Sequence, residues 1–371
     1  MHSRYAIADT SEIISPALIV FREILVENLA GIVQIAGDSA RLRPHCKTHK
    51  MAEITKLQLA AGIVKHKCAT IAEAEMLARA GVRDIFLAYN PVGPNIRRVV
   101  RFVQEFHDVL LSVTADHPAP VAALGGALSA AGRTVDVLLD IDSGQHRTGL
   151  PVGAAARELY AKISGTPGLR PGGFHLYDGQ NHQTNIDERR AAVRSVWEPS
   201  AKLRAELVAA GIPVPRIVAG GTGSFPIFAA IDDPALELSP GTIVFNDGNY
   251  GEMFPDLKFT PAALLLTRVV SRPAADRVTL DLGYKAVASD PPAGKRLFFP
   301  DLPDAKAVLQ NEEHLVLETP DAGRFQPGDE LLAIPGHVCP TSALHKQVYV
   351  VSHGRLQETW QVSARDRVLT I

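Results

Sequence analysis

The sequence predicts a (β/α)₈ barrel that carries an all-β domain at its C-terminal end. Short apolar segments alternate with helix-like stretches as far as Phe254, and only strand-like segments follow. Alternating strands and helices favour parallel strands joined by crossover helices, and eight such units can close into a barrel. We therefore expect a barrel over residues 14–254 and a β domain over residues 255–371 together with residues 1–13. A doubly wound open sheet is the alternative that the even spacing of the units disfavours.

The expected barrel strands are short apolar runs bounded by turn residues. They end near Lys47, Ala69, Tyr89, Val113, Asp140, Tyr177, Gly220 and Phe245. Helix-like stretches between them include residues 52–61, 71–80 and 188–210. Ala-Ala-Gly or Arg-Ala-Gly precedes four of the strands, with the glycine at Gly62, Gly81, Gly132 and Gly211. A glycine there suits the left-handed conformation that ends a helix before the chain turns into a sheet.

The C-terminal part of the chain has a different pattern. Its strand-like segments alternate polar and apolar residues or are rich in β-branched ones, and they cover residues 263–272, 277–283, 314–320, 329–336 and 346–362. Pro, Gly and Asp separate these segments, and no convincing helix interrupts them. This pattern predicts a separate all-β domain.

The composition indicates a globular chain that binds small molecules. Of its residues 46% are hydrophobic and 21% charged, and the net charge of −2 lacks the basic surplus expected of nucleic-acid or anionic-membrane binding. No run approaches the ~18 apolar residues of a membrane span, and the N-terminus lacks the apolar core of a signal peptide. Three cysteines do not suggest a disulfide framework. We expect a cytoplasmic location.

The first predicted strand ends in RPHCKTHK, which places Lys47 beside His45, His49 and Lys50. An active site is expected at such strand ends, because the carboxyl ends of parallel barrel strands form the active-site mouth. A lysine close to other cations loses its proton more readily, as imine formation with an aldehyde requires. A solvated basic loop is the alternative interpretation.

The fifth and seventh predicted strands also end in polar sequences. The fifth ends in DIDSGQHRTG, where His146 and Arg147 could reach the mouth, whereas Asp140 and Asp142 could serve only to cap or bridge loops. The seventh ends in IVAGGTGSF, whose small residues expose several backbone N–H groups and could hold a phosphate. Barrels usually bind phosphate after strand seven. A plain glycine-rich turn is the alternative for this segment.

The C-terminal domain contains IPGHVCPTSALH. On an extended stretch, His337 and Cys339 would point to the same face because they are two residues apart. Imidazole and thiolate form a zinc-type pair, and two protein ligands leave positions open for water or substrate. A buried cysteine beside a loop histidine is the alternative.

Taken together, these segments resemble the D-threonine aldolase/D-serine dehydratase family of fold-type III pyridoxal-phosphate enzymes, which are relatives of alanine racemase. The matching stretches cover essentially the whole chain, from SPALIV through RPHCKTHK, DIDSGQHRTG, GGTGS and DLGYKA to HVCPT and WQVSAR. RPHxK followed far downstream by GGTGS and HxC or HxD in that order is specific, although each piece alone is not. The resemblance implies an alanine racemase-like fold, a homodimer, pyridoxal phosphate and a divalent metal.

The resemblance also implies roles for individual residues. Lys47 corresponds to the Schiff-base lysine, Arg147 to the partner of the cofactor's phenolic oxygen, and Tyr177 to a tyrosine that contacts the cofactor. His337 and Cys339 correspond to the metal pair, with zinc expected and manganese or magnesium as alternatives. The phosphate loop corresponds to Gly221, Thr222, Gly223 and Ser224.

The reaction expected from the resemblance is the removal of water from a D-β-hydroxy amino acid such as D-serine. The family's aldolases typically place Asp two residues after the metal histidine, whereas its dehydratases place Cys, as at Cys339. Retro-aldol cleavage of a D-threonine-like substrate is the alternative, with His182 as the base. After Tyr177 this chain reads Asp178-Gly179-Gln180, where the aldolases show Tyr-His-Gly and a base histidine slightly later. His182 lies close to the position of that base histidine but one residue out of register with it. A substrate other than serine or threonine therefore stays open.

Three further functions are open. A non-catalytic pyridoxal-phosphate-binding barrel would lack the C-terminal β domain that this sequence predicts. An amino-acid racemase would need a second acid–base group, commonly a tyrosine from the β domain, and Tyr250, Tyr284 and Tyr349 lie in no racemase-like motif. A cofactor-free metal-dependent barrel would need more His, Asp and Glu at its strand ends.

Overall fold

The computed structural model describes residues 3–371, which divide into two compact units. The barrel unit comprises residues 33–47, 54–241 and 366–371, and the second unit comprises residues 48–53, 242–365 and those up to residue 32. The predicted boundaries, 14–254 and 255–371 with 1–13, differ from this division at both ends. The N-terminal strand explains part of the difference, because β1 (Ala17–Phe21) pairs with strands of the second unit.

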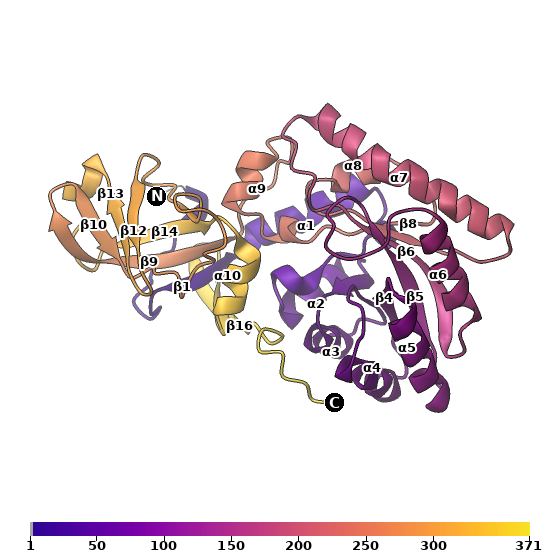
Figure 1. Cartoon of the computed structure of the whole chain (residues 1–371). Coiled ribbons are helices and arrows are strands. Elements are labelled where there is room, and N and C mark those ends of the chain that lie inside the picture. The colour runs from indigo at the N-terminus through magenta and orange to yellow at the C-terminus, as the bar shows by residue number, and fades with distance from the viewer. Residues whose placement is uncertain (1–2) are drawn as a thin grey trace. The chain divides into compact units, whose positions relative to one another are not determined.

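A parallel sheet forms the core of the barrel unit (Figure 1). Its strands pair in sequence order. They are β2 (Lys65–Cys68), β3 (Asp84–Leu87), β4 (Leu110–Ala115), β5 (Val135–Asp142), β6 (Leu169–Tyr177), β7 (Ile217–Ala219) and β8 (Leu236–Leu238). The predicted strand near Phe245 is wrong, because Thr242–Val244 forms a buried 3₁₀ turn and β8 lies before it. A short buried apolar run can be a strand or a turn, and hydrophobic pattern alone does not separate the two.

The extended segment that precedes Lys47 closes the sheet into a barrel. Leu42 bridges to Leu238 of β8 and His45 to Lys67 of β2, both in parallel. The Arg43 amide donates to the Leu238 carbonyl, and the Lys67 amide donates to the Pro44 carbonyl. Pro44 has no N–H to give, so this eighth element has too few ladder bonds for a regular strand.

Helices lie outside the parallel strands in Figure 1. In chain order the structure contains α1 (Arg22–Ala36), α2 (Ala52–Ala60), α3 (Ile71–Arg79), α4 (Pro94–Glu105), α5 (Pro118–Ala130), α6 (Ala154–Gly165), α7 (Ile186–Ala209), α8 (Phe225–Ala229), α9 (Gly248–Met253) and α10 (Val338–Leu344). The glycines expected to end helices have positive φ, between 62° at Gly132 and 106° at Gly81. That prediction is confirmed.

The barrel interior is layered, because alternate residues of a strand share one face. Asp84 on β3 and Asp136 on β5 begin the lowest layer, which is charged. Two residues further along, Phe86 and Leu138 join Val218 in a fully buried apolar layer. Asp140 follows on β5, so the layer above is polar again. The apolar layer separates two polar ends of one barrel.

The second unit is built on a largely antiparallel sheet. Its strands are β1, β9 (Ala263–Ala274), β10 (Arg277–Leu280), β11 (Leu297–Phe298), β12 (Lys306–Gln310), β13 (Leu315–Glu318), β14 (Glu330–Pro335), β15 (Gln347–Ser352) and β16 (Arg355–Gln361). β1 is the exception in direction, because it pairs in parallel with β15. The expected β domain is thus present, and α10 is a helix within it that the sequence pattern did not predict.

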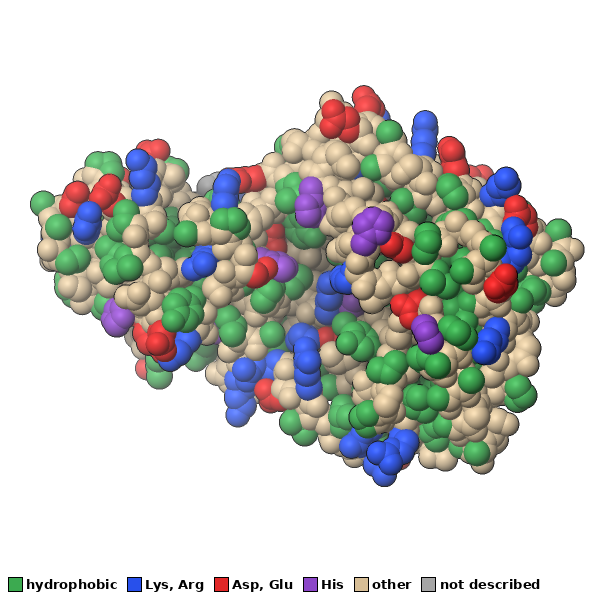
Figure 2. Space-filling view, in the orientation of Figure 1, with side chains coloured by type: hydrophobic (Ala, Val, Ile, Leu, Met, Phe, Trp, Pro, Cys, Tyr) green, Lys and Arg blue, Asp and Glu red, His purple; other side chains and the backbone are tan. Residues whose placement is uncertain are grey.

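Acidic and basic side chains are interspersed over the face shown in Figure 2, as the near-neutral net charge leads us to expect. No helix within residues 3–371 combines the length and the apolar character that crossing a membrane requires.

Candidate active site

A cavity of about 520 Å³ opens at the carboxyl ends of the barrel strands. Its lining includes Lys47, Lys67, Asp140, Arg147, His175 and Tyr177. The ring of Tyr177, the last residue of β6, is a common neighbour of the cations. The Nζ atoms of Lys47 and Lys67 each lie 5.6 Å from the ring centroid, and the Arg147 guanidinium carbon lies 4.9 Å from it. The structure therefore brings Lys47, Arg147 and Tyr177 together in one cavity.

Lys47 is carried by a 3₁₀ turn, Cys46–Thr48, that follows the closing segment. His45 Nδ1 accepts a hydrogen bond from the Lys47 amide, 3.2 Å away, and so fixes the start of this turn. The Cys46 thiol lies 3.8 Å from Glu73 Oε2, which also accepts the Ala69 amide at 2.6 Å. These contacts hold the turn that carries Lys47 against the start of α3.

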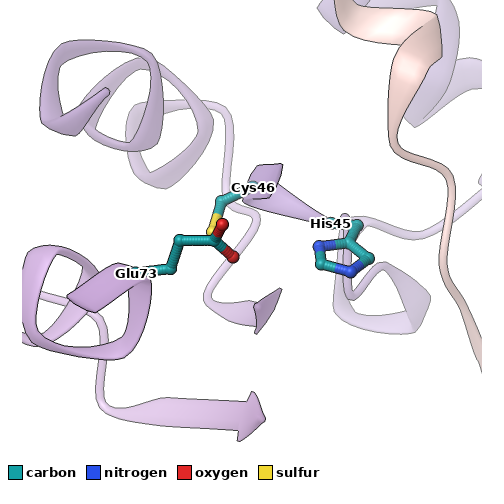
Figure 3. Close-up of side chains that lie close together, drawn as sticks. All are labelled: His45, Cys46 and Glu73. Carbon is teal, nitrogen blue, oxygen red and sulfur yellow. The ribbon is translucent and has the colours of Figure 1, made fainter. Parts of the chain in front are cut away.

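The donor atoms of His45, Cys46 and Glu73 lie within 4.8 Å of one another, as a metal site requires. Figure 3 shows the Cys46 sulfur and the Glu73 carboxylate facing each other, with the His45 ring to one side of them. Since His45 Nδ1 and Glu73 Oε2 already accept backbone amides, we interpret this cluster as structural support for the Lys47 turn.

A buried chain of three side chains crosses the inner wall of the cavity. Lys67 Nζ lies 3.2 Å from His175 Nε2, and His175 Nδ1 lies 2.7 Å from Asp140 Oδ1. Burial lowers the pKa of Lys67 to about 7, and the nearby charges of Lys47 and Arg147 lower it as well, against the attraction of Asp140. Sequence reasoning missed Lys67 and His175 because both lie inside apparently ordinary strands, and it gave Asp140 only a loop role.

The loop after β5 separates its two candidate side chains. Asp142 accepts hydrogen bonds from the amides of Gly144 and His146 and from the His146 ring, so it caps this loop. His146 is thereby held at the surface, and it is not among the residues that line the cavity. Arg147 alone extends from this loop over Tyr177.

The glycine-rich loop after β7 lies against the same tyrosine. A Cβ atom at Gly221 would be 3.3 Å from Tyr177 Cε2, so the backbone passes close to the ring. Thr222, Gly223 and Ser224 are buried, and Ser224 Oγ accepts the Gly221 amide at 3.1 Å. Lys47 and the glycine loop therefore border one ring.

Asp178, next to Tyr177, sits behind the glycine loop. Its Oδ1 accepts the Ser224 hydroxyl at 2.7 Å, and its Oδ2 accepts the Asn181 side-chain amide at 2.9 Å. Burial raises the pKa of Asp178, although these two hydrogen bonds oppose the shift. His182, in contrast, is exposed on the following loop and is not among the residues that line the cavity.

The predicted metal pair lies in the second unit, at the start of a helix rather than on an extended stretch. His337 is the N-cap residue of α10, and Cys339 lies in its first turn. Burial would lower the pKa of His337, but hydrogen bonds with Cys339 and Asp290 raise it to about 9. The helix start therefore brings the two side chains together by a different geometry from the one expected.

The surroundings of this pair suit a metal site. Asp290 Oδ2 lies 2.5 Å from His337 Nδ1, which leaves Nε2 as the ring atom available to a metal, the usual carboxylate–histidine arrangement. Asp247, buried nearby, accepts the Val338 amide at 3.1 Å, and burial raises its pKa to about 6. Cys339 Sγ lies 3.2 Å from Thr48 Oγ1 and 3.4 Å from Thr242 Oγ1.

Comparison with known proteins agrees with this geometry. The model of the alanine racemase N-terminal domain matches residues 22–247, and that of a putative serine dehydratase domain matches residues 262–351. The D-threonine aldolase of Arthrobacter sp. is 34% identical over 87% of this chain and 85% of its own length. The chain belongs to the D-threonine aldolase family of alanine racemase-like enzymes. The predicted family and fold class are thus confirmed.

Solved structures from this family superpose over nearly the whole chain. D-threonine aldolase from Filomicrobium marinum has a TM-score of 0.90 and 30% identity, covering 96% of this chain and 97% of its own. D-threo-3-hydroxyaspartate dehydratase from Delftia sp. HT23 has a TM-score of 0.82 and 25% identity, covering 94% and 97%. A variant of that dehydratase is known in a metal-free form. Both kinds of relative are lyases, which confirms the expected enzyme class.

Proposed function

We propose that this chain is a lyase that uses pyridoxal phosphate and a divalent metal to act on a D-β-hydroxy amino acid. The preferred reaction resembles that of D-serine dehydratase: water is eliminated, water adds back to the product, and a 2-oxo acid and ammonia are released. One observation carries the proposal, namely that Lys47, Arg147 and the Gly221 loop all border the Tyr177 ring at the barrel mouth.

The residues of the cavity match the parts of pyridoxal phosphate. Lys47 would hold the aldehyde carbon as a Schiff base, Arg147 would pair with the phenolic oxygen, and Tyr177 would contact the ring. Gly221, Thr222, Gly223 and Ser224 would surround the phosphate, which glycine-rich turns bind through backbone N–H groups. When bound, the cofactor supplies an electron sink for the pair of electrons left at Cα. Lys47, displaced by the substrate amine, would take the proton from Cα.

A divalent metal fits the His337–Cys339 pair. Asp290 orients the imidazole, and the hydrogen bond between His337 and Cys339 shows that the two side chains are close enough for one metal ion to bind both in its place. A thiolate ligand favours zinc over manganese or magnesium. A metal held there would act as a Lewis acid for the substrate hydroxyl.

Retro-aldol cleavage to glycine and an aldehyde is the second candidate reaction. It is favoured by the 34% identity with D-threonine aldolase and the TM-score of 0.90 with a second such enzyme. Cys339 favours the dehydratase instead, because the family's aldolases typically carry Asp at that position.

A substrate screen distinguishes the two reactions. We would incubate the pyridoxal-phosphate-loaded protein with D-serine, D-threonine and both 3-hydroxy-D-aspartate diastereomers, and measure 2-oxo acid against glycine plus aldehyde. We expect 2-oxo acid from at least one substrate and none from the L-enantiomers. Glycine plus aldehyde as the main products would favour the aldolase, and no product from any substrate would contradict both reactions.

The metal is tested with the active substrate from that screen. Chelation should abolish turnover and added zinc should restore it, whereas Cys339→Ala should lose metal-dependent turnover and keep its cofactor absorbance. Cys68→Ala is the matched control, because it removes a cysteine from β2 without touching the pair. Turnover that withstands both chelation and Cys339→Ala would reject the metal.

A further inference from the structure

Lys67 is a second amine in the cavity, and the proposed function leaves it without a task. Its side chain is almost fully buried and lines the cavity together with Lys47. Both Nζ atoms lie 5.6 Å from the same ring centroid, that of Tyr177. An isolated ammonium at such depth is costly, because burial disfavours its charged form.

The hydrogen bonds around Lys67 have a defined direction. Asp140, an ionised carboxylate, can only accept, so His175 donates to it from Nδ1. The neutral ring then carries its lone pair on Nε2, which accepts from Lys67 Nζ. Burial and the charge of Lys67 lower the pKa of His175, which favours this neutral tautomer. An amine oriented by a histidine and a carboxylate is an arrangement that supports proton transfer.

Burial and two nearby cations favour the loss of a proton from Lys67. Lys47 and Arg147 disfavour a third positive charge, whereas Asp140 and Asp178 favour it, and burial adds to the effect of the two cations. The result is an amine that changes charge near neutral pH. Such a group can both accept and return a proton under ordinary conditions.

We infer that Lys67 takes the proton from the ammonium group of the incoming amino acid. This inference rests on the proposed function. An amino acid enters as an ammonium ion, and it must lose one proton before its nitrogen can displace Lys47. In this step one N–H bond of the substrate breaks and one N–H bond forms at Lys67 Nζ. The substrate nitrogen keeps the electron pair, and the new Lys67 ammonium is stabilised by Asp140 through His175.

The histidine that the resemblance suggests as a base, His182, has a different expected task, which is to take the proton of the substrate hydroxyl in retro-aldol cleavage. His182 is exposed on the loop after β6, whereas Lys67 lines the cavity beside Lys47. A group that exchanges protons with a bound amine must lie within about one hydrogen bond or one water of it.

The exchange of Lys47 for a substrate amine can be measured without turnover. Stopped-flow absorbance would follow the loaded protein mixed with D-alanine, which has no β-hydroxyl to eliminate. We expect Lys67→Met to slow this exchange by about 100-fold, the lower range of a general-base contribution. Lys67→Arg should be equally slow, because a guanidinium stays protonated. Lys65→Met, on the same strand but paired with Glu237, is the control and should exchange at the wild-type rate.

The conservative variant separates proton transfer from simple charge. If Lys67→Arg exchanged at the wild-type rate, Lys67 would supply only positive charge and the inference would be overturned. A wild-type rate in Lys67→Met would overturn it as well. Failure of the wild-type chain to form any Schiff base with pyridoxal phosphate would instead overturn the proposed function together with this inference.

A second measurement on the cofactor-free chain does not depend on variants that fold. Cyanate reacts with uncharged amines, so brief carbamylation at pH 7 followed by peptide mass spectrometry reports which lysines lack their proton. We expect Lys67 to react faster than Lys65, although Lys67 is the more buried of the two. Faster reaction at Lys65 would overturn the inference.

Discussion

The two ends of the barrel interior are both polar, but the charges are balanced at the lower end and unbalanced at the mouth. At the lower end, Arg43 contacts Asp84 at 2.8 Å and Glu237 at 2.5 Å, and Lys65 contacts Glu237 at 2.8 Å. Arg216 pairs with Asp136 of the same layer, so three cations face three carboxylates there. At the mouth, Lys47, Lys67 and Arg147 gather around one ring, and among the described residues that line that cavity Asp140 is the one carboxylate.

This difference indicates which end stabilises the fold and which end binds. A matched set of buried charges satisfies itself and leaves nothing to attract a ligand. An unmatched set of cations costs folding free energy unless an anion arrives, and pyridoxal phosphate brings one in its phosphate and another in its phenolic oxygen. Variants at the lower end should therefore change stability, and variants at the mouth should change ligand binding and rate.

Lys47→Ala should produce the largest effect at the mouth. Without the covalent link, the visible absorbance band of the Schiff base should disappear and turnover should fall by about 1,000-fold or more. Urea unfolding of the cofactor-free protein should show no loss of stability and a slight gain, because the change removes one of the unmatched cations. Together, these measurements test whether a substitution at the mouth changes cofactor binding and turnover without lowering the stability of the fold.

Lys67 provides the control for this prediction, since a second amine in the cavity could capture the aldehyde. Borohydride reduction and peptide mapping of the wild-type protein should find the cofactor on Lys47. A Schiff-base band of full strength in Lys47→Ala would contradict the assignment.

Glu237→Gln should destabilise the lower end by about 3 kcal/mol, because it leaves the fully buried Arg43 with only one of its two carboxylates. The midpoint of urea unfolding measures this loss. The folded fraction should keep its cofactor absorbance and rate, which is the reverse of the Lys47→Ala result. A variant with wild-type stability would show that the lower charge set does not hold the barrel together.

The same variant tests the pH dependence of stability. Burial opposes ionisation of Glu237, but Arg43 and Lys65 outweigh it and lower the pKa to about 2, from an ordinary value of 4.5. A lowered pKa contributes stability above about pH 4.5 that is lost as the pH falls towards 2. The wild-type protein should lose this contribution on acidification, and Glu237→Gln should show a shallower loss over the same interval.

Much of the fold could be predicted from sequence because its signals are local. The glycines at Gly62, Gly81, Gly132 and Gly211 end helices through a conformation that glycine favours, and all four have positive φ. The placement of β1 and β8 could not be predicted in the same way. Both depend on pairing with strands far away in sequence, and a short apolar run does not specify its partner.

The candidate site shows the same limit. Lys47, Arg147, Tyr177 and the glycine loop stand at strand ends, where polar residues are conspicuous in a sequence. Lys67 and His175 lie within strands β2 and β6, and only the closure of the barrel brings them to Asp140. The signal that could have revealed them is a charged or titratable residue at an inward position of a parallel strand, since such strands are usually apolar throughout.

Ser224→Ala should produce the smallest effect, because backbone N–H groups of the glycine loop would stay in place. Ser224 links Gly221 to Asp178, and losing hydrogen bonds worth about 1.4 kcal/mol should weaken pyridoxal phosphate binding about tenfold. Binding of pyridoxal, which lacks the phosphate, should be unchanged, and Ser195→Ala, at an exposed position of helix α7, is the matched control. Fluorescence titration of the cofactor-free protein with both ligands measures the two affinities. Equal weakening of pyridoxal phosphate and pyridoxal binding would mean that Ser224 supports the cavity wall. The polar groups of the mouth would then stabilise the fold, as those of the lower end do.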